Sequence, residues 1–291
     1  LSTRIDRRRG ILKRALLYGL VLVAVLYIVT PFVYMVTTSF MEQREAGKAH
    51  WIPRHPTLKN YRAYVAPDPE IRDVGYATAR DFFPSVVNSL IIAAVVTAFN
   101  LVLGSFAAYG IARIQTRGGF YMLLFYLGSR SIPGVAIMIP MYILMQKVGL
   151  LDTKLAVILA HISFTLPFTI WLLKGCFQTV PADIEHAAWM DGCGRLNGLL
   201  RVFLPCAFPG IVAAGIFCFV FSWGEFLFTL LFTTTMHSKT VTVVASEFVG
   251  ELAMRFPLVA AGGVLSALLP LVLAFIFQRF IIRGIGGAVT G

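Results

Sequence analysis

Residues 83–112 read FPSVVNSLIIAAVVTAFNLVLGSFAAYGIA and contain no charged side chain. The run is longer than the roughly 20 apolar residues that a helix needs to cross a bilayer. Within hydrocarbon a helix satisfies all of its own backbone polar groups, whereas the strands of a membrane barrel show an alternation of about ten residues that is absent here. The run therefore predicts a membrane-spanning helix.

Five further apolar runs accompany this one, at residues 15–40, 120–146, 155–173, 202–235 and 256–278. Of the 39 charged residues in the chain, only Arg130 and Glu225 fall within the six runs. Soluble domains are about 25% charged, whereas this chain is 13% charged and segregates its charge. We predict an all-α integral membrane protein with six transmembrane helices, and we exclude a soluble enzyme, a disordered tail and a disulfide scaffold.

The basic residues predict the orientation of these helices. Six Lys and Arg residues precede the first run, and such clusters favour the cytoplasmic side. Six crossings then place both termini in the cytoplasm. We expect one transmembrane domain over 1–291, with a cytoplasmic segment at 174–206 and external loops at 41–82 and 234–257. The net charge of +11 flanks the membrane runs, which predicts attraction to membrane lipid and no nucleic-acid partner.

The sequence contains little that suggests chemistry. Its four cysteines and five histidines include no C-x-x-C and no zinc spacing. The phosphate-binding sequence G-x-x-x-x-G-K-[ST] does not occur. We expect no catalytic residue, no metal and no ATPase activity in this chain.

Residues 181–205 read PADIEHAAWMDGCGRLNGLLRVFLP and interrupt the apolar pattern. Proline and acidic residues suit the first turn of a helix, which we expect to run to Met190. Gly192 and Gly194 permit the turn that ends it.

A second short helix is expected to follow, with one apolar face at the spacing i, i+3, i+4, i+7, i+8, formed by Leu196, Leu199, Leu200, Phe203 and Leu204. We expect Pro205 to end it. This helix–turn–helix on the cytoplasmic face is equally consistent with an amphipathic connector and with a structure that docks onto a partner.

The segment resembles the EAA loop of binding-protein-dependent ABC importer permeases, whose pattern is E-A-A, three residues, Gly and a distal L-P. The matching residues are Ala187, Ala188, Gly192, Leu204 and Pro205. In this family the glutamate is thought to contact a basic residue of the ATPase. Here His186 stands at that position and Glu185 precedes it. The resemblance implies an ATPase contact in this loop, near Asp191, made either by Glu185 or more weakly and pH-dependently by His186.

Shorter motifs in the same order are similar to those of carbohydrate-importer permeases. They are PRHPTLKNY at 53–61, NS at 88–89 with AAYGIAR at 107–113, IPMY at 139–142 with GLLDT at 149–153, FSWGEFLF at 221–228 and RGIGGAVTG at 283–291. In the fourth motif Gly224 replaces the common Asn. The resemblance, closest to the second permease of maltose-type importers, covers residues from about 50 to the end and implies the type I ABC importer permease fold.

The resemblance also implies the partners and the compartment. We expect a subunit of a bacterial plasma (inner) membrane importer for a sugar or related polyol. Its partners would be a second, different permease, a homodimeric cytoplasmic ATPase that binds ATP and Mg²⁺, and an external solute-binding protein. The tail at 283–291 would touch the ATPase.

Polar residues within the apolar runs are expected to face a cavity or a partner, because charge inside a membrane is costly. The candidates for the translocation pathway are Asn88, Arg130, His161, Trp223 and Glu225. At about 1.5 Å per residue, Arg130 and Glu225 lie at different depths, whereas His161 and Asn88 lie near the level of Glu225. The alternative is structural contact between helices, a snorkelling side chain or, for Trp223, packing.

Three other functions stay open. The first is an ion-coupled secondary transporter that uses Arg130, His161 and Glu225, although no paired halves are visible. The second is an ABC importer permease for a non-carbohydrate small solute. The third is a membrane-embedded enzyme, which predicts clustered acid–base or metal-binding residues, and none is apparent.

Overall fold

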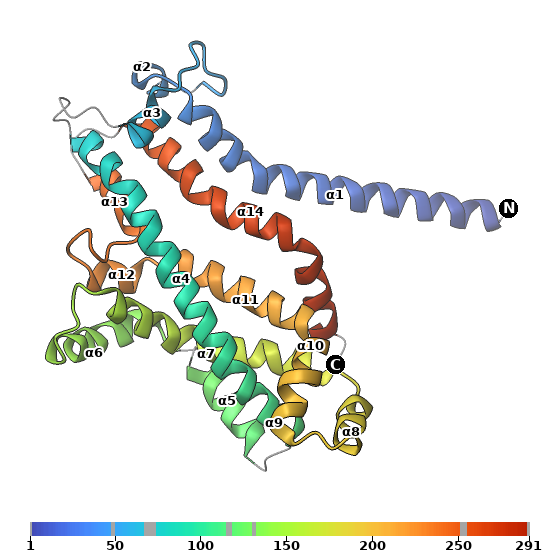
Figure 1. The fold of residues 1–291 in the computed structure, drawn as a ribbon. Coiled ribbons are helices and arrows are strands. Elements are labelled where there is room, and N and C mark those ends of the chain that lie inside the picture. Colours follow the sequence, from blue (N-terminus) through green and yellow to red (C-terminus); the bar gives the residue numbers. More distant parts are fainter. Residues whose placement is uncertain are drawn as a thin grey trace. The chain divides into compact units, whose positions relative to one another are not determined.

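The computed structural model describes residues 2–47, 50–66, 74–114, 118–129, 132–250 and 255–289 (Figure 1). Within these ranges all regular secondary structure is helical, as the sequence predicts. The pathway candidate Arg130 lies outside the described residues.

The longer helices are α1 (Ser2–Ser39), α4 (Val74–Arg113), α5 (Gly119–Ser129), α6 (Gly134–Lys147), α7 (Lys154–Gln178), α11 (Phe208–Trp223), α13 (Val241–Gly250) and α14 (Phe256–Val289). Shorter elements are α2 (Gln43–Ala46), α3 (Lys59–Val65), α8 (Ala182–Met190), α9 (Arg195–Gly198), the π turn η1 (Leu199–Phe203), α10 (Leu204–Cys206) and α12 (Leu227–Phe232). Helices α2 and α3 lie within the predicted 41–82 loop, and α13 lies within the predicted 234–257 loop.

Four described helices, α1, α4, α7 and α14, are long and apolar enough to cross a membrane. A fifth candidate is the bent pair formed by Arg195–Cys206 and α11, whose two parts meet at 79°. Helix α6 is apolar but shorter. The first, second, fourth and sixth predicted spans are therefore present as long helices, and the other two are broken.

The prediction of one helix over 120–146 is wrong, because Pro133 stands at the N-cap of α6 with an extended backbone. Proline disfavours helical geometry in the residue before it, so α5 and α6 are separate helices. The fifth helix, expected at about 207–233 within the apolar run at 202–235, is also not continuous. Helix α11 ends at Trp223, and the chain restarts as α12 at Leu227.

The last helix continues further than predicted. We expected it to end near Arg279 and to leave a glycine-rich tail, but α14 continues to Val289. The sequence after Arg279 contains glycines but no proline. Glycine costs only about 1 kcal/mol in a helix interior, whereas proline would end or kink the helix.

Packing divides the chain into two compact units, one of residues 1–80 with 248–265 and one of residues 81–247 with 266–291. In the first unit, small residues of α14 meet larger side chains. A Cβ added at Gly262 would lie 2.5 Å from Tyr64 Oη, and one at Gly263 would lie 2.9 Å from Met35 Sδ. Tyr64 Oη also donates a 2.8 Å hydrogen bond to the Leu258 carbonyl.

The second unit has a core at each end of α7. One buried cluster includes Tyr109, Phe177 and Phe203, and the other includes Val96, Val157 and Phe232. Helices α7 and α11 approach closely at Gly210, where an added Cβ would lie 2.5 Å from Cys176 Cβ. Small residues permit such approaches between membrane helices.

This contact predicts that Gly210→Ala destabilises the protein by about 1–3 kcal/mol, because the new methyl group has no space. Cys176→Gly in the same background should restore most of the loss. Gly110→Ala is the matched control, since its added methyl meets nothing within 4 Å. Thermal unfolding of the purified protein measures the effect, and an unchanged melting temperature for Gly210→Ala would contradict the packing.

Candidate functional site

Helix α8 begins and ends as its sequence predicts. Pro181 occupies the N-cap, and Asp183 and Glu185 lie in the first turn. After Met190 the chain turns at Gly192, whose φ of +81° lies in the left-handed region that favours glycine. Gly194 adopts an ordinary φ of −64°, so it is not required by the turn geometry.

The second helix of the segment differs from the prediction. Residues 199–203 form a π turn in which Leu204 N donates to the Leu199 carbonyl, five residues back. A π turn breaks the 3.6-residue period, so the expected apolar face is only partly buried. Leu199 and Phe203 are buried, whereas Leu196 is 60% exposed and Leu200 46% exposed.

The expectation that Pro205 ends the second helix is also wrong. Pro205 lies within α10, in the first turn of that helix, and is exposed, while Leu204 is half-buried. Proline is tolerated there because first-turn amides have no partner within the helix. The chain bends after Cys206, before α11 begins.

Glu185 lies on the inner side of α8, against the C-terminal end of α4. It is 7% exposed and accepts a 2.8 Å hydrogen bond from Tyr109 Oη. Arg113 Nε lies 3.0 Å from the other carboxylate oxygen, as an ion pair without hydrogen-bond alignment. A buried carboxylate needs such a partner, because an unpaired charge in this environment is strongly destabilising.

Arg113 extends this contact to the rest of the segment. Its terminal nitrogen donates to the Val180 carbonyl just before α8, and its guanidinium lies 5.0 Å from the centre of the Phe203 ring. The Tyr109 ring also packs edge-on against Phe203, at 5.2 Å. We name the set of Tyr109, Arg113 and Glu185 the α4–α8 latch, since it joins these two helices.

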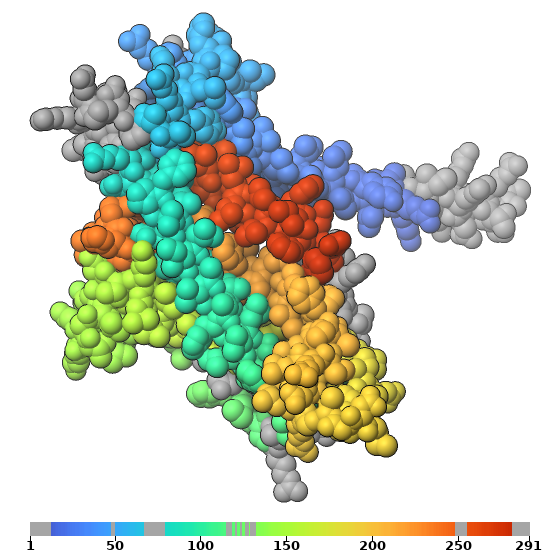
Figure 2. Space-filling view, in the orientation of Figure 1, coloured from blue at the N-terminus to red at the C-terminus, as the bar shows by residue number. Residues whose placement is uncertain are grey.

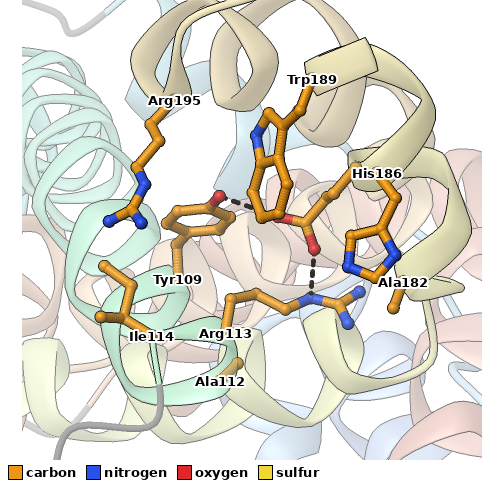
Figure 3. A pocket seen from close by; sticks show the side chains of 9 residues that line it. Tyr109, Ala112, Arg113, Ile114, Ala182, His186, Trp189 and Arg195 are labelled. Atoms are coloured by element: carbon orange, nitrogen blue, oxygen red, sulfur yellow. Dashed lines mark hydrogen bonds and ion pairs between the residues drawn. The ribbon is translucent and has the colours of Figure 1, made fainter.

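A cavity of about 350 Å³ lies beside the latch (Figure 3). Besides the latch residues, its lining includes His186, Trp189 and Arg195. The rings of His186 and Trp189 lie 5.4 Å apart. Figure 2 shows the yellow and gold atoms of this segment gathered at the surface beside the end of α4.

Other residues of α8 and its turn are exposed, and among them His186 borders the cavity beside the latch (Figure 3). His186, Ala187 and Asp191 are exposed, and Ala188 is buried with Glu185. Glu185 and His186 were the two candidates for a contact with a partner protein. The Glu185 carboxylate already has partners within the chain. The imidazole of His186 is available at the surface.

Two of the pathway candidates meet in the second unit. His161 is fully buried, with Nδ1 2.8 Å from Ser222 Oγ and Nε2 3.1 Å from Glu225 Oε2. The Glu225 carboxylate also accepts hydrogen bonds from the backbone amides of Phe228 and Thr229, at 2.9 and 3.1 Å. Glu225 thus caps the start of α12, which explains the break in the predicted fifth helix. The side chains of His161 and Glu225 thus lie in contact within the second unit.

The other two described candidates also have partners within the chain. The Asn88 amide donates to the carbonyls of Met236 and Lys239, at 2.9 and 3.0 Å. Trp223 is 5% exposed, stacks on Phe219, and donates a 3.3 Å hydrogen bond to the Ser266 carbonyl.

Asp152, like Glu225, accepts hydrogen bonds from backbone amides, and the sequence does not predict this role. Its carboxylate accepts hydrogen bonds from the backbone amides of Thr234 and Thr235 and from the hydroxyls of Thr235 and Ser238. Burial alone would raise the pKa of this carboxyl, but these hydrogen bonds outweigh burial and hold the pKa well below its usual range. Asp152 itself has a φ of +58°, a left-handed conformation that aspartate tolerates better than most residues.

Tyr109 and Arg113 are the residues of the latch that sequence reasoning missed. Both belong to the AAYGIAR motif, so their position at the end of a helix was visible. Their partner lies more than 70 residues away in the chain, which no local pattern indicates. Among the described residues, no group of three or more His, Cys, Asp or Glu side chains could hold a metal ion.

Comparison with known proteins gives a family match. A family model described as the binding-protein-dependent transport system inner membrane component matches residues 100–287. The trehalose/maltose transport system permease protein MalG of Thermococcus litoralis is 31% identical over 288 residues, 98% of this chain and 99% of the relative. The trehalose transport system permease protein SugB of Mycobacterium tuberculosis is 31% identical over 268 residues, 91% of this chain and 93% of the relative.

Solved structures share the fold. A chain of a bacterial ABC transporter involved in the import of the acidic polysaccharide alginate matches with a TM-score of 0.73, over 95% of this chain and 97% of that chain. A chain of the MetNI methionine ABC transporter matches with a TM-score of 0.53, over 70% of this chain and 95% of that chain. The identities of 20% and 17% limit both likenesses to the fold.

The latch predicts an energetic coupling between two helices that are distant in sequence. Arg113→Ala and Glu185→Ala should each destabilise the protein, and the double variant should lose less than the sum. An interaction energy of about 0.5–3 kcal/mol is expected for residues in direct contact. Thermal unfolding of the four proteins measures it, with Asp183→Ala as control because Asp183 is an exposed acid on the same helix. Additive losses for Arg113 and Glu185 would contradict the latch.

Proposed function

Because this chain belongs to the family of inner-membrane components of binding-protein-dependent transport systems, we propose that it is a permease subunit of an ATP-driven importer for a sugar or related polyol. The observation that carries the proposal is the family match over residues 100–287, which includes the whole α8–α10 segment. The sugar class is supported by relatives named for trehalose and maltose that align along nearly the whole chain. The protein resides in a bacterial plasma (inner) membrane as a multi-pass subunit.

We propose six crossings with both termini in the cytoplasm. Support comes from the four long apolar helices and the bent α9–α11 pair. The remaining crossing would be made by α5 and α6 together, because neither 11 nor 14 helical residues reach across a core of about 30 Å at 1.5 Å per residue.

The partners in this proposal are a second permease, a homodimeric cytoplasmic ATPase that binds ATP and Mg²⁺, and an external solute-binding protein. A solved alginate transporter of the same fold is described in complex with a pentasaccharide-bound periplasmic protein. The exposed side of α8 would meet the ATPase through His186, Ala187 and Asp191. The external loops 41–82 and 234–257 would meet the binding protein, and the tail at 283–291 would reach the ATPase.

The latch suggests how motion at α8 reaches the membrane. Closure of the ATPase dimer would move α8, and the Arg113–Glu185 ion pair would pass that displacement to α4. A second route runs through the π turn to α11. ATP binding would thus bias a two-state equilibrium between inward-open and outward-open forms. In this role Glu185 is a positioning residue, and the direct contact falls to His186.

For the translocation pathway we propose the cluster around His161 and Glu225, with Asn88, Trp223 and Arg130 as further candidates. Both carboxylate oxygens of Glu225 are occupied within the chain. Contact with a sugar hydroxyl therefore requires a conformation in which one of these bonds opens. The alternative, a purely structural contact, predicts that a change of Glu225 affects assembly and transport equally.

The proposal is tested by purifying the assembled complex, identifying the co-purifying subunits, and measuring ATPase stimulation by binding protein loaded with candidate sugars. If only binding protein loaded with a non-carbohydrate ligand stimulated ATP hydrolysis, the transported solute would not be a sugar or polyol. Uptake into vesicles driven by a proton gradient without any ATPase would instead favour an ion-coupled secondary transporter.

The turn after α8 predicts a specific coupling defect. Gly192→Pro cannot adopt the φ of +81°, since proline holds φ near −65°. The backbone strain, about 1–3 kcal/mol, should be relieved by a shift of α8 away from its native position. We expect this shift to lower uptake about tenfold or more while ATP hydrolysis continues. Gly194→Ala is the matched control in the same turn, with an ordinary φ and open space around the added methyl. If the Gly192→Pro variant took up substrate as fast as the wild type, the turn after α8 would have no role in coupling.

Glu225→Gln should impair substrate-stimulated transport more than assembly of the complex. Glutamine retains one acceptor for the α12 amides but loses the charge paired with His161, and hydrogen bonds to charged groups contribute about 1.5–3 kcal/mol. Uptake at matched protein levels is the measurement. Ser163→Ala serves as control, because Ser163 is exposed on α7 and its hydroxyl bonds only the Ala160 carbonyl of its own helix. Equal uptake by Glu225→Gln and wild type would argue against a pathway role.

A further inference from the structure

The segment that follows α12 forms a closed loop with that helix. Its two ends meet where Thr242 Oγ1 donates a 2.8 Å hydrogen bond to the Glu225 carbonyl. We name residues 225–242 the α12 loop and residues 234–238 its tip. Compact surface loops whose ends lie close together are frequently functional. The proposed function uses Glu225 at the base of this loop and leaves the way its tip is held unexplained.

The tip of the α12 loop presents polar side chains to its surroundings. Thr234, Thr235 and His237 are exposed. Exposed side chains of α4, such as Leu90 and Phe99, are apolar and suit hydrocarbon or an apolar helix of another membrane subunit. A hydroxyl or imidazole placed in such surroundings would lose its hydrogen bonds to water. The tip is therefore suited to water and to the polar surface of a soluble protein.

Asp152 holds one side of the tip although the tip is exposed. Its backbone amide donates to the Phe232 carbonyl at the end of α12, at 2.8 Å. Its carboxylate accepts hydrogen bonds from the Thr234 and Thr235 amides, at 2.9 and 3.0 Å. The hydroxyls of Thr235 and Ser238 donate to the same carboxylate, each at 2.6 Å. One residue thus fixes the end of α12 and the turn beyond it.

Helix α4 holds the other side of the loop. The Asn88 amide donates to the carbonyls of Met236 and Lys239, and Ser89 Oγ accepts a 2.8 Å hydrogen bond from the Val241 amide. The backbone on both sides of His237 is therefore ordered before any partner arrives. Ordering of loops on association weakens binding, so a surface that is already ordered binds more tightly.

The backbone of Asp152 is itself in a disfavoured conformation. Its φ of +58° lies in the left-handed region, which residues other than glycine, asparagine and aspartate rarely adopt. Such conformations persist where surrounding contacts enforce them, and they concentrate at functional sites. Here the contacts that enforce it are the hydrogen bonds to the α12 loop.

We propose that Asp152 is a positioning residue for docking of the external solute-binding protein, because it holds the tip of the α12 loop as a preformed polar surface that this protein contacts. The inference rests on the proposed function, which places the tip outside the membrane and supplies the soluble partner. It adds the surface that the partner meets and the residue that keeps this surface in place.

Hydrogen exchange of the assembled complex tests the hold itself, without ATP or binding protein. Asp152→Gly removes the carboxylate and permits the φ of +58°, so the Thr234 and Thr235 amides should exchange about tenfold or more faster. Asp152→Asn also tolerates this φ and retains Oδ1, which accepts from both amides. It should keep most of the protection. Unchanged exchange in Asp152→Gly would overturn the positioning role.

The docking role is measured by titrating the complex with the co-purifying binding protein, loaded with the sugar that most stimulates ATP hydrolysis by the wild type. In Asp152→Gly the half-saturating concentration of binding protein should rise about fivefold or more, whereas the rate at saturation should change less than about twofold. A general loss of structure would instead lower the saturated rate. Asp152→Asn should restore most of the affinity. Ser163→Ala, exposed on α7, is the control and should match the wild type.

A cross-linking arm identifies what meets the tip. Photoreactive p-benzoylphenylalanine in place of His237 should cross-link to the loaded binding protein. Cross-links to the second permease instead would assign the tip to that subunit and would overturn the proposal. An unchanged half-saturating concentration in Asp152→Gly would also overturn it while the stimulated wild type upholds the proposed function. Absence of stimulation of the wild type by any loaded binding protein would overturn the proposed function and the docking role together.

Discussion

Hydrocarbon offers no hydrogen-bond partner to a backbone amide or carbonyl, and the described structure follows from this constraint. Long helices satisfy their backbone internally, and at some of the described breaks a side chain replaces the missing partner. Glu225 accepts from the amides that open α12, and Asp152 accepts from two amides of the segment that follows it. Asn88 donates to two carbonyls of that same segment. Asn88 and Glu225, both within apolar runs, therefore support irregular backbone, and any role in transport is added to that structural role.

Buried polar groups also need partners where α8 meets α4. A carboxylate as buried as that of Glu185 requires a cation, and Arg113 at the last turn of α4 supplies it. The resulting ion pair joins a surface helix to a membrane helix directly, without the intervening loops. The neighbouring His186 stays exposed at the cavity beside this ion pair. One interaction thus determines both how the segment is held and which residues it presents.

Local chemistry was sufficient to predict most of the helices. The segregation of charge, the first-turn residues of α8 and the glycine at its end depend only on neighbours in sequence, and those predictions are confirmed. The failures have a common cause. Pro133 and Glu225 break two runs that composition alone reads as continuous, and a single π turn disturbs the apolar period after Gly198. Hydropathy averages over such single-residue effects and does not register them.

Membrane residence and family membership follow from the amino-acid sequence, because the lengths of the apolar runs and the order of the short motifs can be read from the sequence directly. The direction of each polar side chain does not follow from it. Glu185 and His186 are adjacent in sequence, yet one residue turns a helix by about 100°, so one faces Arg113 and the other faces solvent. The partners of Glu185 and of Glu225 lie on segments distant in the chain. Only the packing of those segments brings the groups within bonding distance or leaves them apart.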